Sequence, residues 1–390
     1  MKTLFDDLDQ ENELTWKEKW NYFQVNLPHQ DKPFSKRNWG DGLHSLCSYQ
    51  GKMKPSLAYH LVTIFSKRGD RILDPFVGVG TIPFEAALNG VEAIGFDINP
   101  VALTISRGKV GLHSEDDASA LIKELDSFIG SAKPTTEEFE SAQQMNFNST
   151  IPEYFHPKTL NEILLARRFF LQNPPDNPSE NLVFASLLHI LHGNRPYALS
   201  RRSHPITPYK PTGEFEYRAL IPRLKKKVLR SICTLRNDHF FPGQIFDQDA
   251  TALWPTEVQD IDAIITSPPF FDSTRFHIGN WMRLWLSGWE RADFDTKPAE
   301  YVDERQKSSF DVYRPILAQA KSRLKPDGVI VFHLGLSKKA NMAASLIEIA
   351  REDFRVYDMF VEDVTHTEKH GMRDKGTVSG HQYLILVNKD

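Results

Sequence analysis

The sequence of 390 residues is poor in cysteine, in long apolar runs and in net charge. Cys47 and Cys233 are its two cysteines, so neither a disulfide framework nor a CxxC metal site is available. No stretch approaches the roughly 18 apolar residues that a membrane-spanning helix needs. The acidic first residues, MKTLFDDLDQENEL, lack the basic-then-apolar order of a signal peptide. We therefore expect a cytoplasmic location.

The net charge of -4 does not by itself indicate a nucleic-acid binder, but the charge is unevenly distributed. Residues 195–230 contain ten Lys and Arg residues against two Glu residues. This excess fits either a solvated helix face or a surface that contacts phosphate groups. The stretch NRPYALSRRSHPITPYKPTGEF, with its prolines, is predicted to be a loop. The candidate nucleic-acid-binding residues are Arg195, Arg201, Arg202, His204, Lys210 and, from a later segment, Arg275.

The chain is organised around residues 72–99, ILDPFVGVGTIPFEAALNGVEAIGFDIN. A short apolar strand comes first, and Gly78 and Gly80 then let the backbone turn and pass close to a ligand. Apolar side chains at helical spacing predict a helix over 81–88, and a second strand delivers Asp97 about 20 residues after the turn. An acid at that place usually binds a ribose diol, so a nucleotide-like ligand is predicted.

This spacing alone leaves two classes of site open, because dinucleotide-binding folds also combine a glycine turn with a distant acid. Here Asp74 leads the turn, and a carboxylate repels phosphate but suits a cationic ligand. The DPFxGxGT form resembles motif I of the amino-directed S-adenosylmethionine methyltransferases. The resemblance implies S-adenosylmethionine as the cofactor, with Asp74 near its methionine part and Asp97 at its ribose. The cofactor contacts implied by this stretch are Asp74, Pro75, Phe76, Gly78, Gly80, Thr81, Asp97 and Ile98.

The segment before the glycine turn fits the same resemblance. A helix is predicted over 55–65, with Pro55 in its first turn. An irregular loop followed by such a helix resembles motif X, which packs against the methionine end of the cofactor. Tyr49, Lys54 and Pro55 are the contacts that it implies, although Lys54 also fits a surface lysine.

A short strand is predicted over 244–249, and it ends in the pair Asp249 and Ala250. The pair resembles motif III, in which the acid binds the exocyclic amine of the cofactor's adenine. A surface acid after a strand is the alternative interpretation.

Residues 262–270, DAIITSPPF, form the second decisive stretch. A buried strand is predicted to end at Ser267-Pro268-Pro269-Phe270, and open α/β sheets bind ligands at the carboxyl ends of their strands. The two prolines fix the backbone and remove two N–H donors, so the turn presents carbonyl oxygens and the Ser267 hydroxyl. Such acceptors suit an exocyclic amine, and Phe270 would stack on a base flipped out of a duplex.

The tetrapeptide resembles motif IV of the same family. Asp or Asn before Pro-Pro is typical of its adenine-N6 and guanine-N2 enzymes, whereas Ser is typical of its cytosine-N4 enzymes, so Ser267 indicates cytosine. Phe270 departs from the usual Tyr, a change that keeps the stacking but loses any hydrogen bond from a phenol. A C5-cytosine enzyme is excluded, because it needs a thiolate and neither cysteine lies in a Pro-Cys turn. The expected catalytic residues are Ser267, Pro268, Pro269 and Phe270.

The resemblance implies an α/β class I methyltransferase fold, with a mostly parallel, Rossmann-like sheet and a C-terminal antiparallel strand pair. Residues 1–43 are expected to form an N-terminal arm, and residues 44–110 and 241–390 the catalytic domain. Residues 111–240 lack strand signals, so they are predicted to be a mainly helical insertion that carries target recognition. The irregularly spaced histidines near the C-terminus do not predict a metal site.

The sequence thus predicts a prokaryotic, S-adenosylmethionine-dependent enzyme that flips a cytosine out of double-stranded DNA and methylates its N4 amine. A cognate restriction endonuclease would be its protein partner in restriction-modification. Adenine-N6 methylation of DNA and guanine-N2 methylation of tRNA stay open as alternatives, although the tRNA enzymes normally show Asn or Asp before Pro-Pro and add an RNA-binding domain. A nucleic-acid-binding protein that uses the same fold without catalysis is the alternative from another class.

Overall fold

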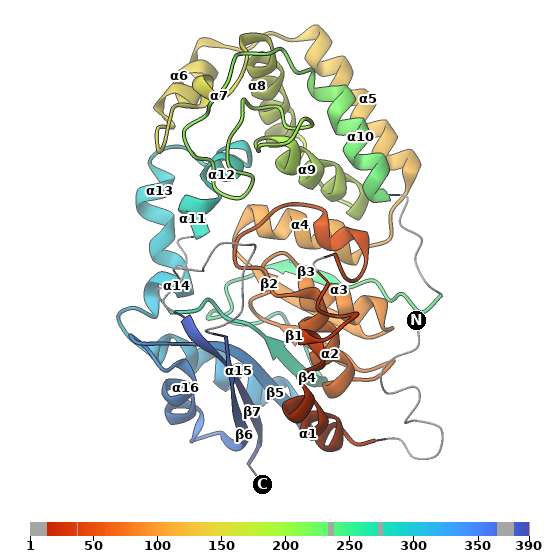
Figure 1. Cartoon of the computed structure of the whole chain (residues 1–390), viewed down its shortest axis with the longest axis vertical. Coiled ribbons are helices and arrows are strands. Elements are labelled where there is room, and N and C mark those ends of the chain that lie inside the picture. Colours follow the sequence, from red (N-terminus) through yellow and green to blue (C-terminus); the bar gives the residue numbers. More distant parts are fainter. Residues whose placement is uncertain (1–13, 37, 233–237, 272–275, 365–377, 390) are drawn as a thin grey trace.

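The structure, a computed structural model, describes residues 14–36, 38–232, 238–271, 276–364 and 378–389. At its centre lies a seven-stranded sheet with the strand order β3-β2-β1-β4-β5-β7-β6 (Figure 1). The strands are β1 (Arg71–Asp74), β2 (Glu92–Asp97), β3 (Gln244–Asp247), β4 (Ile261–Thr266), β5 (Leu324–Ser337), β6 (Phe354–Asp363) and β7 (Val378–Asn388).

The pairing of the strands identifies the fold class. β1 pairs in parallel with both β2 and β4, and β3 and β5 extend the parallel part on either side. β7 runs antiparallel between β5 and β6. A mostly parallel sheet that ends in this antiparallel arrangement is the class I methyltransferase topology, so the predicted fold class is confirmed. Because β1 and β4 are neighbours, the segments that follow them emerge side by side at the carboxyl edge of the sheet.

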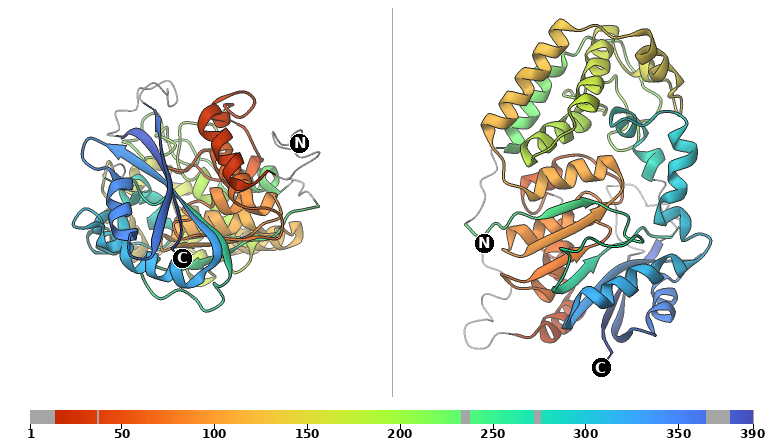
Figure 2. Two further views of the ribbon diagram at one scale, coloured as in Figure 1. Left: turned by 90° about the horizontal axis from the view of Figure 1, so that it is seen from below. Right: turned by 180° about the vertical axis from the view of Figure 1, so that it is seen from behind.

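Helices cover both faces of the sheet (Figure 2). One face packs against α1 (Trp16–Asn26), α2 (Pro55–Phe65) and α3 (Thr81–Leu88). The other packs against α15 (Arg314–Arg323) and α16 (Met342–Ala350). The bounds predicted for the helices over 55–65 and 81–88 agree with those of α2 and α3. Short 3-10 turns complete the connections: η1 (Pro28–Gln30), η2 (Gly42–Ser45), η3 (Lys297–Glu300) and η4 (Phe310–Tyr313).

A group of helices, called here the helical lobe, stands at one end of the molecule (Figures 1 and 2). Most of it comes from the segment between β2 and β3, as predicted: α5 (Glu115–Ser131), α6 (Thr136–Gln144), α7 (Ile151–Tyr154), α8 (Pro157–Gln172), α9 (Pro178–Ile190) and α10 (Leu220–Ile232). The helix α4 (Pro100–Val110) connects the lobe to the sheet. At Gly108 the two helices α4 and α9 approach so closely that a Cβ atom would lie 3.0 Å from the Leu182 nitrogen.

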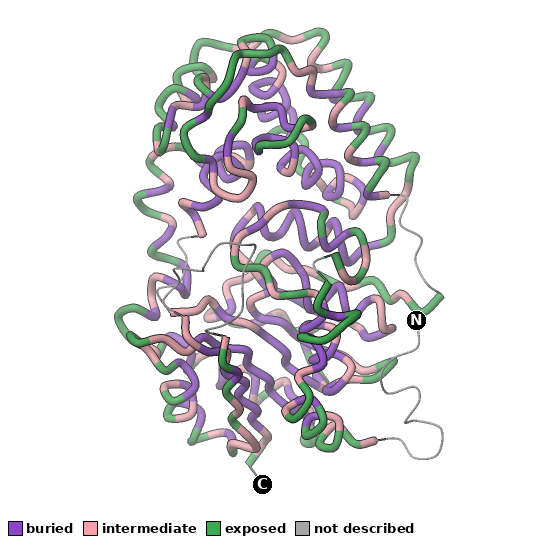
Figure 3. The backbone as a smooth tube through the Cα atoms, in the orientation of Figure 1, coloured by how far each residue is buried: buried purple, intermediate pink, exposed green. Residues whose placement is uncertain are grey.

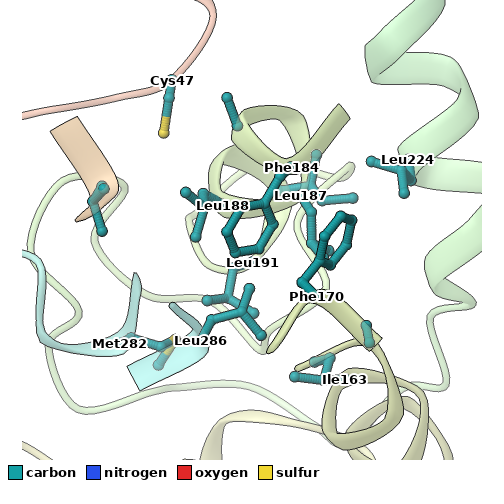
Figure 4. Close-up of a cluster of buried hydrophobic side chains, with 14 of the residues drawn as sticks. Cys47, Ile163, Phe170, Phe184, Leu187, Leu188, Leu191, Leu224, Met282 and Leu286 are labelled. Carbon is teal, nitrogen blue, oxygen red and sulfur yellow. The ribbon is translucent and has the colours of Figure 1, made fainter. Parts of the chain in front are cut away.

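A second segment, which the sequence analysis did not place there, also belongs to the helical lobe. It follows the diproline turn and contains α11 (Phe276–Gly279), α12 (Trp281–Leu286) and α13 (Asp293–Thr296), whereas the next helix, α14 (Val302–Arg305), packs with Val302 against the core of the sheet. Met282 and Leu286 pack among side chains of α8, α9 and α10, and Cys47 reaches the same cluster (Figure 4). The lobe is therefore built from two stretches of chain, and the domain boundaries given above stay a prediction.

Buried residues concentrate in the strands and in the inner helices of the lobe (Figure 3). All six residues of α12 are buried, and so are most residues of α9. Among the described residues, no helix combines the length and the apolar character that crossing a membrane requires.

Candidate active site at the ends of β1 and β4

The turn after β1 is built around glycine. Gly78 and Gly80 have φ angles of 49° and 69°, in the left-handed region that favours glycine. Gly80 precedes α3, and a Cβ atom there would lie 2.9 Å from the Cβ atom of Ser106 on α4. A side chain at position 80 would therefore separate α3 from α4. Gly78 keeps part of its surface exposed, with open space where a Cβ atom would stand.

Asp97 ends β2 and holds the glycine turn in place. Its carboxylate accepts three backbone hydrogen bonds, from the N–H groups of Gly78 (2.9 Å), Ile98 (2.9 Å) and Asn99 (2.8 Å). Burial raises the pKa of Asp97 to about 6, although the three N–H donors oppose that rise. A carboxylate has about four lone-pair sites, so three bonds leave acceptor capacity for a ligand hydroxyl. Asp97 and Ile98 are half-buried, so a ligand can reach them.

Asp74 lies at the end of β1 and is buried. Its Oδ1 atom accepts hydrogen bonds from the Phe76 N–H (3.1 Å) and from the Thr266 hydroxyl (2.6 Å). Burial raises the pKa of the Asp74 carboxyl to about 7, and the two hydrogen bonds oppose that rise. Thr266 is the last residue of β4, directly before Ser267. One hydrogen bond thus joins the glycine turn to the diproline turn.

Side chains from distant parts of the chain hold the diproline turn. The Ser267 hydroxyl lies 3.1 Å from Nδ1 of His333 on β5. The Pro269 carbonyl accepts a hydrogen bond from the Gln306 side chain (3.0 Å), which in turn accepts one from the Tyr313 hydroxyl (2.9 Å). Pro268 is buried, whereas Ser267 is half-buried and stays accessible at the turn.

Phe270 packs against the C-terminal part of the sheet. Its ring lies so close to β5 that a Cβ atom on Gly335 would come within 2.8 Å of it. It also contacts the rings of His333, at 5.4 Å between centroids, and His381, at 5.8 Å. Phe270 is half-buried, so part of the ring remains available, and stacking on a base stays a prediction.

The structure separates the residues predicted before the glycine turn. The Tyr49 hydroxyl is buried 3.5 Å from the side-chain nitrogen of Asn99, and the Tyr49 ring stacks on Phe276. Burial, with the nearby charge of Asp97, raises the pKa of Tyr49 well above its ordinary value. Lys54 instead points to the N-terminal segment, where it donates to the backbone carbonyl of His29. Pro55 begins α2, as predicted. The cofactor roles of Tyr49, Lys54 and Pro55 stay predictions.

Asp249 and Ala250 lie just beyond β3, on the same edge of the sheet as Asp97. Asp249 accepts hydrogen bonds from the backbone N–H (2.8 Å) and the hydroxyl (2.9 Å) of Thr251. About a third of the Asp249 side chain is exposed, and Arg305 lies 3.5 Å from it. The position fits an adenine contact, which stays a prediction.

Two residues near Asp97 were missed by the sequence analysis. Tyr301 and Asp303 lie around the start of α14, and both are buried. Among the described residues the Tyr301 hydroxyl has no hydrogen-bond partner. Burial, and then the charges of Asp97 and Asp303, raise the pKa of Tyr301. Burial raises the pKa of Asp303 to about 6. No motif marks them, because they follow the diproline turn by some thirty residues.

These observations show that the residues present fit a nucleoside cofactor with a cationic end. Asp97 keeps acceptor capacity for a ribose, Gly78 leaves room beside it, and the buried Tyr301 hydroxyl has no hydrogen-bond partner within the part of the chain that the structure describes. Asp74 offers a buried carboxylate between the two turns. Among the described residues, no three His, Cys, Asp or Glu side chains gather in a way that would hold a metal ion.

The predicted nucleic-acid-binding residues divide into two groups. Arg195, Arg202 and Lys210 are exposed on the loop between α9 and α10. Arg201 and His204 instead build that loop. The Arg201 guanidinium donates to backbone carbonyls and lies over the Phe215 ring, and His204 Nδ1 accepts from backbone N–H groups. Arg275 lies outside the described residues.

The same loop reaches the neighbourhood of the candidate site. The buried Arg283 of α12 donates to the carbonyls of Pro205 and Ile206, which fixes this part of the loop on the lobe. The Thr207 hydroxyl donates to the side chain of Gln50, at 3.4 Å. Gln50 follows Tyr49, so the loop between α9 and α10 touches the segment that borders Asp97. A cavity of about 540 Å³ opens elsewhere on the lobe, between Phe139, His156 and Phe215, and none of the predicted site residues lines it.

Comparisons with known proteins indicate the family that the chain resembles. Residues 6–107 match the family described as DNA methylase. The Type II methyltransferase M.BsoBI of Geobacillus stearothermophilus is 24% identical over 277 residues, which cover 61% of this chain and 52% of that protein. M.MvaI of Kocuria varians is 23% identical over 280 residues, which cover 67% and 62%. The chain thus spans about half to two thirds of these curated relatives. The resemblance to the amino-directed DNA methyltransferases is confirmed, and S-adenosylmethionine is the methyl donor that it implies.

A shorter match concerns an RNA enzyme. A tRNA (guanine(10)-N2)-dimethyltransferase of Methanothermobacter thermautotrophicus is 52% identical over 52 residues. These residues cover 13% of this chain and 16% of that protein. The high identity over a short stretch indicates a shared local motif, whereas the Type II methyltransferases match over most of the chain.

Proposed function

We infer that this relative of the amino-directed DNA methyltransferases transfers a methyl group from S-adenosylmethionine to the N4 amine of cytosine in double-stranded DNA. The observation that supports it most is the 2.6 Å hydrogen bond from Thr266 to Asp74. It sets the glycine turn and the Ser-Pro-Pro-Phe turn against each other, so a methyl donor in the first and an amine at the second would be neighbours. In-line transfer requires that proximity.

The cofactor would lie along the glycine turn. Asp97 would accept hydrogen bonds from the ribose hydroxyls, and the carboxylate of Asp74 would face the cationic methionine end. Tyr301 and Asp249 would complete the nucleoside side. When bound, the cofactor supplies an electrophilic methyl group on a sulfonium. The protein's own contribution is to hold this group in place and to keep the opposite charge of Asp74 nearby.

The target amine would be held by the diproline turn. The Ser267 hydroxyl and the turn's carbonyl oxygens would accept its two N–H bonds, and Phe270 would stack on the flipped base. An exocyclic amine is a poor nucleophile because its lone pair is delocalised into the ring. Fixed acceptors favour the pyramidal form that attacks, so catalysis depends mostly on positioning. Ser at position 267, rather than Asp or Asn, is what favours cytosine over adenine.

Two observations favour DNA as the substrate. The relatives that match most of this chain are named Type II methyltransferases. Arg195, Arg202 and Lys210 are exposed on a loop that is fixed to the lobe and that touches the segment beside the site. Such side chains would neutralise phosphates while the base enters the turn. A cognate endonuclease that cuts the same sequence is the partner we propose.

The test begins with binding and then measures transfer. We expect calorimetry to show stoichiometric binding of S-adenosylmethionine to the full chain. Radiolabelled methyl groups should then appear in mixed-sequence duplex DNA, and mass spectrometry of the nucleosides should identify N4-methylcytosine. A duplex of only A·T pairs is the matched control and should stay unlabelled. Labelled N6-methyladenine would mean that adenine, not cytosine, is the target base. Labelled tRNA would mean that RNA, not DNA, is the substrate. Cofactor binding without methyl transfer to either nucleic acid would refute the proposed methyltransferase activity.

A further inference from the structure

Ser267 has a partner that the Ser-Pro-Pro-Phe motif does not contain. Its Oγ atom lies 3.1 Å from Nδ1 of His333, a residue 66 positions later in the chain. The sheet sets this contact. Thr266 at the end of β4 is in register with Phe332 of β5, so the next residues along the two parallel strands are Ser267 and His333.

The surroundings hold the His333 ring in one place. His333 is 4% exposed, and it contacts the rings of Phe270, His381 and Tyr383 at centroid distances of 5.4, 4.7 and 5.3 Å. Among the described residues, the titratable groups whose rings contact it are His381 and Tyr383, both on β7. The Tyr383 hydroxyl donates to Glu362 at 2.6 Å, and this carboxylate also contacts His29. The Glu362 carboxylate is therefore already hydrogen-bonded to Tyr383 and His29.

A serine at this position poses a problem that Asp or Asn does not. A hydroxyl both donates and accepts hydrogen bonds. A hydroxyl that offered its own hydrogen to the target nitrogen would occupy the lone pair that must attack. The Ser267 hydrogen therefore needs another acceptor, and Nδ1 of His333 stands within hydrogen-bond distance.

We propose that His333 is a positioning residue, which orients the Ser267 hydroxyl as an acceptor for the target amine and receives, through Ser267, the proton that this amine loses. The proposal rests on the proposed function. It requires the neutral imidazole whose hydrogen is on Nε2, so that Nδ1 accepts.

The proton balance is complete. As the bond from nitrogen to methyl forms, the sulfur–methyl bond breaks and its electron pair stays on sulfur. The amine nitrogen then carries a positive charge and gives one proton to Ser267 Oγ, while the hydroxyl proton passes to His333 Nδ1. The methylated amine ends neutral, and the imidazolium releases its proton to water before the next cycle.

Kinetics of two variants test the proposal. His333→Ala should lower kcat by about 100-fold, the lower end of the contribution from a positioned proton-transfer group, while the Kd for S-adenosylmethionine stays within twofold. His333→Asn retains an amide oxygen that accepts the Ser267 hydrogen but takes up no proton. It should recover part of kcat and lose the decline of kcat at acid pH that protonation of His333 gives the native enzyme. Equal kcat and equal pH profiles in the Asn variant and the native enzyme would overturn the proposal.

His381→Ala is the matched control, because His381 is a second histidine that contacts both the Phe270 ring and the His333 ring. This variant should keep the decline of kcat at acid pH, and its loss there would assign the titration to His381 instead. If His333→Ala does not fold, as judged by circular dichroism, the Asn variant decides alone.

Nitrogen-15 NMR of the histidine rings gives a readout that does not depend on turnover. Nδ1 of His333 should have the shift of an unprotonated acceptor, and Ser267→Ala should move it. A hydrogen on Nδ1 would overturn the inference and leave the proposed function intact. Conversely, a Ser267–His333 hydrogen bond in a protein that methylates no nucleic acid would refute the proposed function.

Discussion

The turns after β1 and β4 lie side by side, but opposite means build them. The first depends on glycines at positive φ, and it directs N–H groups inward, as Gly78 does toward Asp97. The second depends on Pro268 and Pro269, which have no N–H to donate. One turn thus provides room and donors, whereas the other provides acceptors. That division suits a bulky nucleoside with a cationic end on one side and an amine on the other.

The two turns also differ in where their restraints come from. Asp97 lies 19 positions after Gly78, within a single strand-turn-helix-strand unit. The diproline turn is held by Gln306, His333 and Met342, which lie 37, 66 and 71 positions from their partners at Pro269, Ser267 and Phe271. The Asp97 contacts of the glycine turn are therefore local in the chain, and the diproline turn is fixed by the completed sheet. The Asp74–Thr266 hydrogen bond links the two turns across 192 positions. Variants that affect one turn and spare the other test this division.

Asp74→Ala should have the largest effect, on the glycine-turn side. We expect the Kd for S-adenosylmethionine to rise by more than about 30-fold, because truncating one partner of a buried charge pair costs about 2–5 kcal/mol. Calorimetry measures it. Asp262→Ala is the matched control: Asp262 also accepts a backbone N–H bond, from Arg71, but at the opposite end of β1 and β4. Equal affinities in the two variants would remove Asp74 from the cofactor site.

Ser267→Ala should affect the other turn. The expected result is a fall in kcat of about 100- to 1000-fold with the Kd for the cofactor unchanged, because the amine loses a positioned acceptor. Single-turnover methyl transfer measures the chemical step directly. The exposed Ser322 of α15 supplies a control, Ser322→Ala, that should keep the native rate. Full activity of Ser267→Ala would mean that the Ser267 hydroxyl does not position the target amine.

The same contrast explains what the sequence could predict. The helices over 55–65 and 81–88, the strand that delivers Asp97 and the class of the sheet follow from local periodicity and turn chemistry. Those signals need only neighbouring residues. His333, Gln306 and Tyr301 carry no local signal, since no motif distinguishes His333 in its apolar strand or Gln306 and Tyr301 in their polar segment.

The helical lobe shows a related limit. Its inserted helices were recognisable from the absence of strand signals, but the assignment of α12 to the lobe was not. Trp281 and Trp285 have helical spacing, which predicts a packed helix without telling which core receives it. Only the contacts with α8 and α9 place that helix.

Gln306→Leu should also affect the diproline turn, but with a smaller effect than Ser267→Ala. Leu is close to Gln in volume and cannot bond to the Pro269 carbonyl or the Tyr313 hydroxyl. We expect kcat to fall about tenfold and the unfolding free energy to drop by about 2 kcal/mol, since the buried Tyr313 hydroxyl and the half-buried Pro269 carbonyl each lose a partner. Gln319→Leu removes a similar bridge, to backbone atoms of residues 252 and 254, and should lower stability while keeping kcat. If Gln306→Leu and Gln319→Leu lower kcat equally, the effect of Gln306→Leu does not come from the diproline turn.

The smallest expected effect is the dependence of stability and of cofactor affinity on pH. Burial raises the pKa of Asp74 to about 7 and that of Asp97 to about 6, from an ordinary value of 3.8. Raised folded-state values mean that both carboxyls favour the folded protein most below about pH 4, and that this contribution is lost as the pH rises through 6 to 7. A cationic ligand has the opposite preference, because it binds the ionised carboxylates. Binding must therefore release protons in this range.

Affinity for S-adenosylmethionine should accordingly increase between pH 5.5 and 7.5, by at most about tenfold per pH unit for each linked proton. Asp74→Asn fixes an uncharged side chain of the same shape, so it should bind weakly throughout and show a flatter profile, with the remaining slope from Asp97. Calorimetry in two buffers of different ionisation enthalpy counts the protons released. A native affinity independent of pH would mean that Asp74 does not face the cationic end of the cofactor, and the turn after β1 would then act through its glycines and Asp97 alone.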